Sequence, residues 1–117
     1  MSDEILEQKI EKLREIGDKH ADAKATLSLL ENNRKILLAT LMKEFMINSN
    51  TGNLDSAVAQ EREARADDRY KKHIEALAIA VKNEAKWNWE KKIVEMNFET
   101  WKTKMISQMK ERKQYGA

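Results

Sequence analysis

The stretch INSNTGNLDS, residues 47–56, is rich in residues that form turns. Asn and Gly accept left-handed backbone conformations, and Asn, Asp, Ser and Thr side chains bond to nearby backbone amides in turns. No comparable run occurs elsewhere among the 117 residues, which include no proline and only three glycines. The stretch therefore predicts one loop that divides a helical chain into two long parts.

The segments on either side of this loop have the composition of helices. The chain is 36% charged and 41% hydrophobic, and this mixture is typical of long helices and coiled coils. We predict a helix at about residues 3–46, a loop at 47–55, a short helix at about 56–66 and a long helix at about 68–114. The predicted fold is all-α: a single domain, residues 1–117, forming a long antiparallel, coiled-coil-like helical hairpin with a short corner helix.

Two ends of the predicted helices are marked by capping residues. Asp55 or Ser56 suits the N-cap of the short helix. The pair Asp67-Asp68 predicts a second break, because Asp is a poor residue inside a helix and a good cap. The alternative is one continuous helix from residue 55, and the sequence leaves both open.

The first long helix carries a heptad pattern that predicts a coiled-coil seam. One seam position holds Leu6, Leu13, His20, Leu27, Arg34 and Leu41. The other is predicted to hold Ile10, Gly17, Lys24, Glu31, Leu38 and Phe45. Near the loop, apolar residues occupy a wider arc of this helix, which includes Ile36 and its neighbours. We expect this end to form a small core with Leu54, Val58, Tyr70, Ile74 and Leu77.

The last long helix is apolar on two faces when its residues are placed 100° apart. The first face holds Tyr70, Ile74, Ala78, Val81, Ala85, Trp89, Ile93 and Met96. The second holds Trp87, Val94, Phe98, Trp101, Met105 and Met109. A two-helix hairpin buries only one side of each helix. We therefore predict that the second face is an oligomer or partner interface, in a homo-oligomer with a dimer favoured. Whether Trp87 or Trp89 faces the first helix stays open.

The charge distribution leaves nucleic-acid binding as an alternative. Residues 82–117 carry nine basic and five acidic side chains, a net charge of +4. Their lysines surround the helix between glutamates, whereas a nucleic-acid groove needs a stripe of positive charge. We favour solvated flanks for most of them, and assign any nucleic-acid contact to Lys104, Lys110, Arg112 and Lys113.

No motif of the sequence is typical of catalysis or of a metal or cofactor site. The two histidines, His20 and His73, lie on different predicted helices, the glycines are isolated and cysteine is absent. We expect no enzymatic activity, no cofactor and no metal. The acidic, amphipathic start and the lack of a long apolar run predict no signal peptide, no membrane span and a cytoplasmic location.

Three stretches resemble a family of short, mostly uncharacterised helical proteins of tailed phages and prophages. They are NNRKILLATLMKE (32–44), SAVAQEREARADDRYKKHIEAL (56–77) and WEKKIVEMNFETWKTKM (89–105). The chain departs from the family pattern at Asp68, where the family often has proline. The resemblance implies a phage protein in the host cytoplasm, encoded near recombination or replication functions, and it carries no catalytic residues.

We therefore expect a non-enzymatic, phage-type helical accessory or assembly protein. It would oligomerise and bind a protein partner, of unknown identity, in DNA recombination, replication or host-defence interplay. The alternative is a direct nucleic-acid-binding accessory protein that uses the C-terminal Trp/Lys segment.

Overall fold

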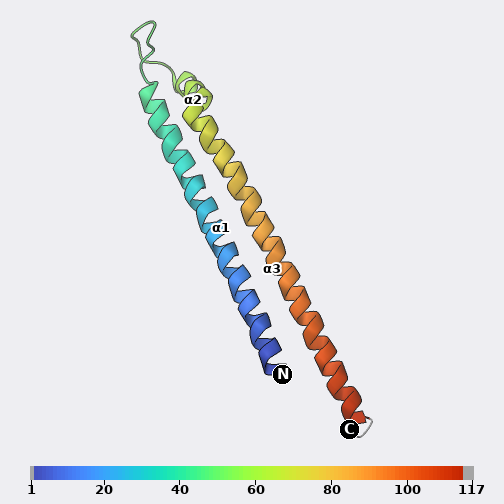
Figure 1. Cartoon of the computed structure of the whole chain (residues 1–117). Coiled ribbons are helices and arrows are strands. Elements are labelled where there is room, and N and C mark those ends of the chain that lie inside the picture. The colour runs from blue at the N-terminus through green and yellow to red at the C-terminus, as the bar shows by residue number, and fades with distance from the viewer. Residues whose placement is uncertain (1, 115–117) are drawn as a thin grey trace. The chain divides into compact units, whose positions relative to one another are not determined.

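A computed structural model describes residues 2–114, which form three helices (Figure 1). They are α1 (Ser2–Glu44), α2 (Ala57–Ala66) and α3 (Asp68–Gln114). The described part of the chain has no strand beyond the isolated antiparallel bridge between Ile47 and Leu54. The predicted all-α helical hairpin with a short corner helix is confirmed, and every helix limit lies within two residues of the predicted one.

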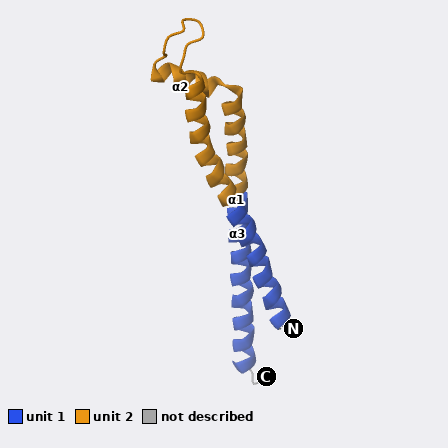
Figure 2. Ribbon diagram, turned by 90° about the vertical axis from the view of Figure 1, so that its left-hand side faces the viewer, with its two compact units in different colours: residues 1–22, 85–117 blue, residues 23–84 orange. Residues whose placement is uncertain are grey.

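The chain divides into two compact units, and each contains part of α1 and part of α3 (Figure 2). Unit 1 consists of Met1–Asp22 and Ala85–Ala117. Unit 2 is Ala23–Glu84, and it includes the loop and α2.

The two long helices run antiparallel within each unit. In unit 2, Arg69 pairs with Glu44, and His73 Nε2 donates a hydrogen bond of 2.8 Å to the Leu30 carbonyl. Residue numbers thus fall along α3 as they rise along α1. The lysine–tryptophan contacts of unit 1, described below, follow the same order.

The loop between α1 and α2 is a small, hydrogen-bonded turn built on Asn48. Its side-chain oxygen accepts from the amides of Asn50 at 2.8 Å and Thr51 at 3.3 Å. Its backbone amide donates to Asn53 O, and its carbonyl accepts from the amide of Gly52, both at 2.8 Å. Gly52 has φ 71°, which glycine adopts without the steric cost that a Cβ atom brings. The predicted turn chemistry is therefore what closes this loop.

The break between α2 and α3 lies at Asp67. This residue has φ −68° and ψ 139°, outside the helical region. Its carboxylate accepts from the Arg69 amide at 2.8 Å, which caps the first turn of α3. At the start of α2, Ser56 Oγ accepts from the Ala59 amide at 3.2 Å and is the N-cap. The structure therefore selects Ser56 over Asp55 and excludes one continuous helix from residue 55.

An arginine joins the end of α1 to the start of α3. The Arg69 guanidinium lies 2.6 Å from Glu44 Oε2 and 3.0 Å from Asp67 Oδ1. These charge-assisted hydrogen bonds lower the pKa of the Asp67 carboxyl and raise the pKa of Arg69. The guanidinium therefore holds the break and the helix end together.

The core of unit 2 lies where the three helices meet. Leu41 is fully buried and packs in one cluster with Ala64 and Tyr70. Leu37, Leu38, Met42 and Phe45 lie partly buried around this cluster.

The expected membership of this core is only partly confirmed. Leu54 and Val58 are 67% and 76% exposed, and Ile36 is 64% exposed, so none of them joins it. Ala64 is the residue of α2 that joins the core. Its small side chain lets the short α2 approach α1 closely.

The seam of the hairpin is marked by buried and half-buried side chains at alternating spacings of three and four residues. In α1 they are Leu6, Lys9, Leu13, Ile16, His20, Ala23, Leu27, Leu30, Arg34, Leu37 and Leu41. In α3 they are Tyr70, His73, Leu77, Ala80, Glu84, Trp87, Lys91, Val94, Phe98, Trp101 and Met105.

The first predicted seam position of α1 agrees with this pattern, and the second agrees in part. Of the second set, Gly17, Glu31, Leu38 and Phe45 are half-buried, and Leu38 and Phe45 pack on the Leu41 cluster. Ile10 and Lys24 are exposed, and the neighbouring Lys9 and Ala23 are half-buried in their place. Residues three and four positions away from a seam residue lie on either side of it. Which of them is buried depends on the side from which α3 packs.

We predict that Leu41→Ala lowers the free energy of unfolding by about 2–5 kcal/mol, because it leaves a cavity at the junction of three helices. Leu29→Ala is the matched control, since Leu29 lies on the same helix and is 60% exposed. It should change stability by no more than about 0.5 kcal/mol. Urea denaturation followed by circular dichroism measures both. Equal destabilisation of the two variants would contradict the assigned core.

Candidate functional site

The aromatic segment of α3 lies against α1 in unit 1. Trp87, Val94, Phe98, Trp101 and Met105 are half-buried. They follow the seam spacing that continues from Tyr70. The face that the sequence analysis assigned to a partner is therefore packed, at these five positions, inside the hairpin. Met109, the sixth predicted interface residue, is 58% exposed.

Lysine side chains cover the two seam tryptophans. Lys19 Nζ lies 4.9 Å and Lys86 Nζ 5.2 Å from the centroid of the Trp87 ring. Lys9 Nζ lies 5.5 Å from the Trp101 centroid. These distances are within the range of cation–π attraction, and the lysine stems add apolar cover. Stacking of a nucleic-acid base on either ring would have to displace a lysine.

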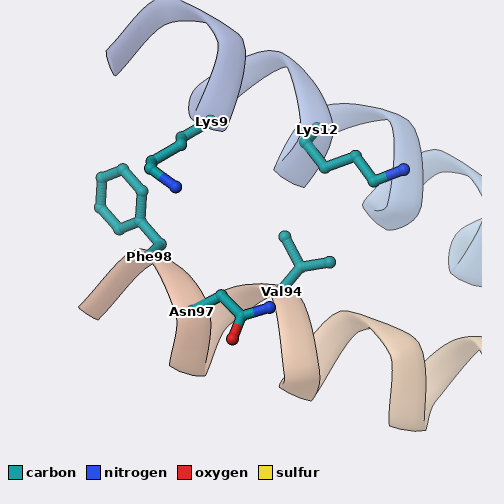
Figure 3. A pocket seen from close by; sticks show the side chains of 5 residues that line it. All are labelled: Lys9, Lys12, Val94, Asn97 and Phe98. Carbon is teal, nitrogen blue, oxygen red and sulfur yellow. The ribbon is translucent and has the colours of Figure 1, made fainter. Parts of the chain in front are cut away.

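A small groove opens beside this seam (Figure 3). Lys9 and Lys12 of α1 and Val94, Asn97 and Phe98 of α3 line it, and its volume is about 170 Å³. Ligand pockets usually measure about 300–1,000 Å³. The lining contains two ammonium groups, an amide and apolar groups, and at this size the groove can hold only a small group.

The opposite side of α3 in unit 1, here called the outer face, exposes two large side chains. Trp89 is 63% and Met96 is 66% exposed. Beside Met96 is a shallow, open hollow lined by Lys92, Glu95, Met96, Glu99 and Thr100. Trp89 and Met96 share one predicted face, but the sequence left open which face turns towards α1. The continuous three-four spacing from Tyr70 to Met105 is the signal that could have decided it.

The predicted nucleic-acid contacts lie in the last turns of α3. Lys104, Lys110, Arg112 and Lys113 are all exposed on that helix. They lie beyond Trp101, so the exposed cations and the lysine-covered aromatic rings occupy successive parts of the helix.

The described residues contain no group of three or more His, Cys, Asp and Glu side chains arranged to hold a metal ion. His73 is engaged with the Leu30 carbonyl at 2.8 Å. Across residues 2–114, no helix combines the length and the apolar character needed to cross a bilayer. Comparisons with protein-family models, with curated proteins and with solved structures gave no match.

We predict that Lys19→Met lowers the free energy of unfolding by about 0.5–1 kcal/mol, because it removes a cation from the face of Trp87 while keeping an apolar stem. Lys19→Arg should retain most of the stability. Lys24→Met is the control, since Lys24 is an exposed lysine of the same helix outside the seam. Chemical denaturation compares the three variants, and a destabilisation by Lys24→Met equal to that by Lys19→Met would contradict the prediction.

Proposed function

We propose that this chain is a non-enzymatic helical assembly protein that self-associates and presents its hairpin to a protein partner. The observation that carries the proposal is the surface left exposed. Trp89 and Met96, two large apolar side chains on one side of α3, are 63% and 66% exposed. Packing of another molecule on this side of the helix would cover both.

The nature of the exposed side chains supports the same proposal. Large hydrophobic side chains more than 60% exposed include Ile36, Val58, Ile79, Trp89 and Met96. Single exposed apolar residues are ordinary, and groups of them mark interaction surfaces; of these residues, Trp89 and Met96 share one side of α3.

The biological setting of the proposal comes from the resemblance to proteins of tailed phages and prophages. On that basis the partner acts in DNA recombination, replication or host-defence interplay, in the cytoplasm of the host cell. The mixed charge of the hairpin, with 22 basic and 20 acidic residues in the whole chain, suits a protein partner better than a polyanion.

The self-association is tested by sedimentation equilibrium of the unmodified chain across the micromolar range. We expect the mean mass to rise with concentration towards twice the 13.7 kDa of one chain. A mass of one chain at every concentration would overturn the assembly function.

Direct nucleic-acid binding is the second candidate, and the exposed basic end of α3 favours it. Replacing Lys110, Arg112 and Lys113 by Ala should weaken binding to single-stranded DNA. It should also flatten the dependence of log K on log salt by about 0.7–1 for each phosphate that no longer binds a cation. The matched control replaces Lys35, Lys71 and Lys72, which are exposed lysines of unit 2. Equal effects of the two triple variants, or no binding at low salt, would refute this candidate.

A further inference from the structure

The two compact units bury their side chains to different extents. Among the residues that the structure describes, the buried side chains of unit 2 are Leu41, Ala64, Tyr70 and Ala80, whereas unit 1 buries Ile16 alone. The free energy needed to open a segment of a protein rises with the apolar contacts that the segment buries. The two units should therefore differ in local stability.

The helices of unit 2 are also held together by short polar contacts. Arg69 of α3 lies 2.6 Å from the carboxylate of Glu44 in α1, and His73 Nε2 donates to the Leu30 carbonyl at 2.8 Å. The loop that joins α1 to α2 belongs to the same unit. Separation of α1 from α3 in unit 2 would break these contacts together with the packing around Leu41.

The packing between the helices of unit 1 leaves open space. The groove of about 170 Å³ lies between α1 and α3 in this unit (Figure 3). Gly17 of α1 is half-buried, yet a Cβ atom added to it would have no neighbour within 4 Å beyond its own stretch of helix. Atoms that line such gaps lose the dispersion contacts that close packing provides.

The tryptophans in the seam of unit 1 contact α1 partly through lysine ammonium groups. Lys19 Nζ lies 4.9 Å from the centroid of the Trp87 ring, and Lys9 Nζ lies 5.5 Å from that of Trp101. The Lys19 side chain is exposed, so its ammonium group remains hydrated while it contacts the ring. A cation that already reaches water loses little when the ring moves away.

We infer that unit 1 opens independently of unit 2. In the opened state residues 2–22 of α1 separate from residues 85–114 of α3, while the Leu41 core stays closed. The separation uncovers the covered aromatic face, which consists of Trp87, Val94, Phe98, Trp101 and Met105. The first half of α1 is thus a cover that has to move before another molecule can contact this face. The inference concerns contacts within one chain, so it holds whether or not the chain self-associates.

Hydrogen exchange of the unmodified chain, followed by mass spectrometry, tests the opening. Helical amides are protected only while their hydrogen bonds persist, and a separated helix is marginally stable in water. Residues 9–22 and 85–101 leave out the frayed ends of both helices. Their amides should exchange at least about tenfold faster than those of α1 and α3 in unit 2, after correction for intrinsic rates. Equal protection of the two units would overturn the inference.

Ile16→Ala tests whether the two helix segments of unit 1 open together. It removes the buried side chain of this unit, so exchange of residues 85–101 in α3 should become at least about tenfold faster, although the substitution lies in α1. Exchange in unit 2 should stay within about threefold of its original rate. Ile10→Ala is the matched control, because Ile10 lies in the same part of α1 and is 43% exposed. It should change the rates of both units by about threefold or less.

Gly17→Ala should have the opposite effect on unit 1. Alanine is the better helix former, and the added methyl group has room, so exchange of residues 9–22 should become about fivefold slower while unit 2 is unchanged. This variant stabilises the hairpin and gives a result even if Ile16→Ala does not fold.

Two other outcomes would overturn the inference. If either Ile16→Ala or Gly17→Ala changes exchange equally in both units, the hairpin opens as a single unit. If Ile16→Ala speeds exchange in α1 but not in residues 85–101, the first half of α1 unfolds without destabilising the part of α3 that it covers. A chain that stays monomeric and opens in unit 1 alone would refute the proposed self-association and leave this inference standing.

Discussion

The junction at Leu41 is the contact on which the hairpin depends. Its side chain is fully buried against Ala64 and Tyr70, so one residue of α1 contacts both α2 and α3. The Asp67 cap and the Arg69 guanidinium then set where α3 begins relative to the end of α1. Tyr70 joins this junction from α3, and three residues later His73 Nε2 donates to the Leu30 carbonyl, so contact between α3 and α1 continues into unit 2.

Beyond this junction the seam stabilises the hairpin less than an apolar coiled coil would. Polar side chains occupy seam positions of both helices, among them Arg34, His73 and Lys91. Each can be satisfied by a specific partner, as His73 is by the Leu30 carbonyl, and such polar positions favour one register at a cost in stability. In unit 1, lysine stems and ammonium groups replace apolar contacts around Trp87 and Trp101.

Local chemistry and the packing side of α1 were largely predictable from the sequence, but the packing side of α3 was not. The turn at Asn48 and the caps at Ser56 and Asp67 follow from short-range hydrogen bonds that these residue types make in many contexts. The side of α3 that packs was obscured because its seam includes Glu84 and Lys91, so a search for apolar residues selects the other face. A two-helix contact tolerates polar groups at seam positions when their ends reach water. A hydrophobicity pattern does not identify such seam positions, because it counts these residues as polar.

The tryptophans on the two faces of α3 have different surroundings, and this difference bears on function. Trp87 and Trp101 are covered by lysines within the chain, which occupies both their rings and those ammonium groups. A base or a phosphate would have to compete with these contacts.

Trp89 instead lies outside the seam and projects from the outer face at 63% exposure. An indole exposed to that degree loses hydrophobic stabilisation unless something covers it. The hollow beside Met96, lined also by Glu95 and Glu99, lies on this exposed part of the helix, whereas the exposed basic residues predicted to contact nucleic acid lie in its last turns.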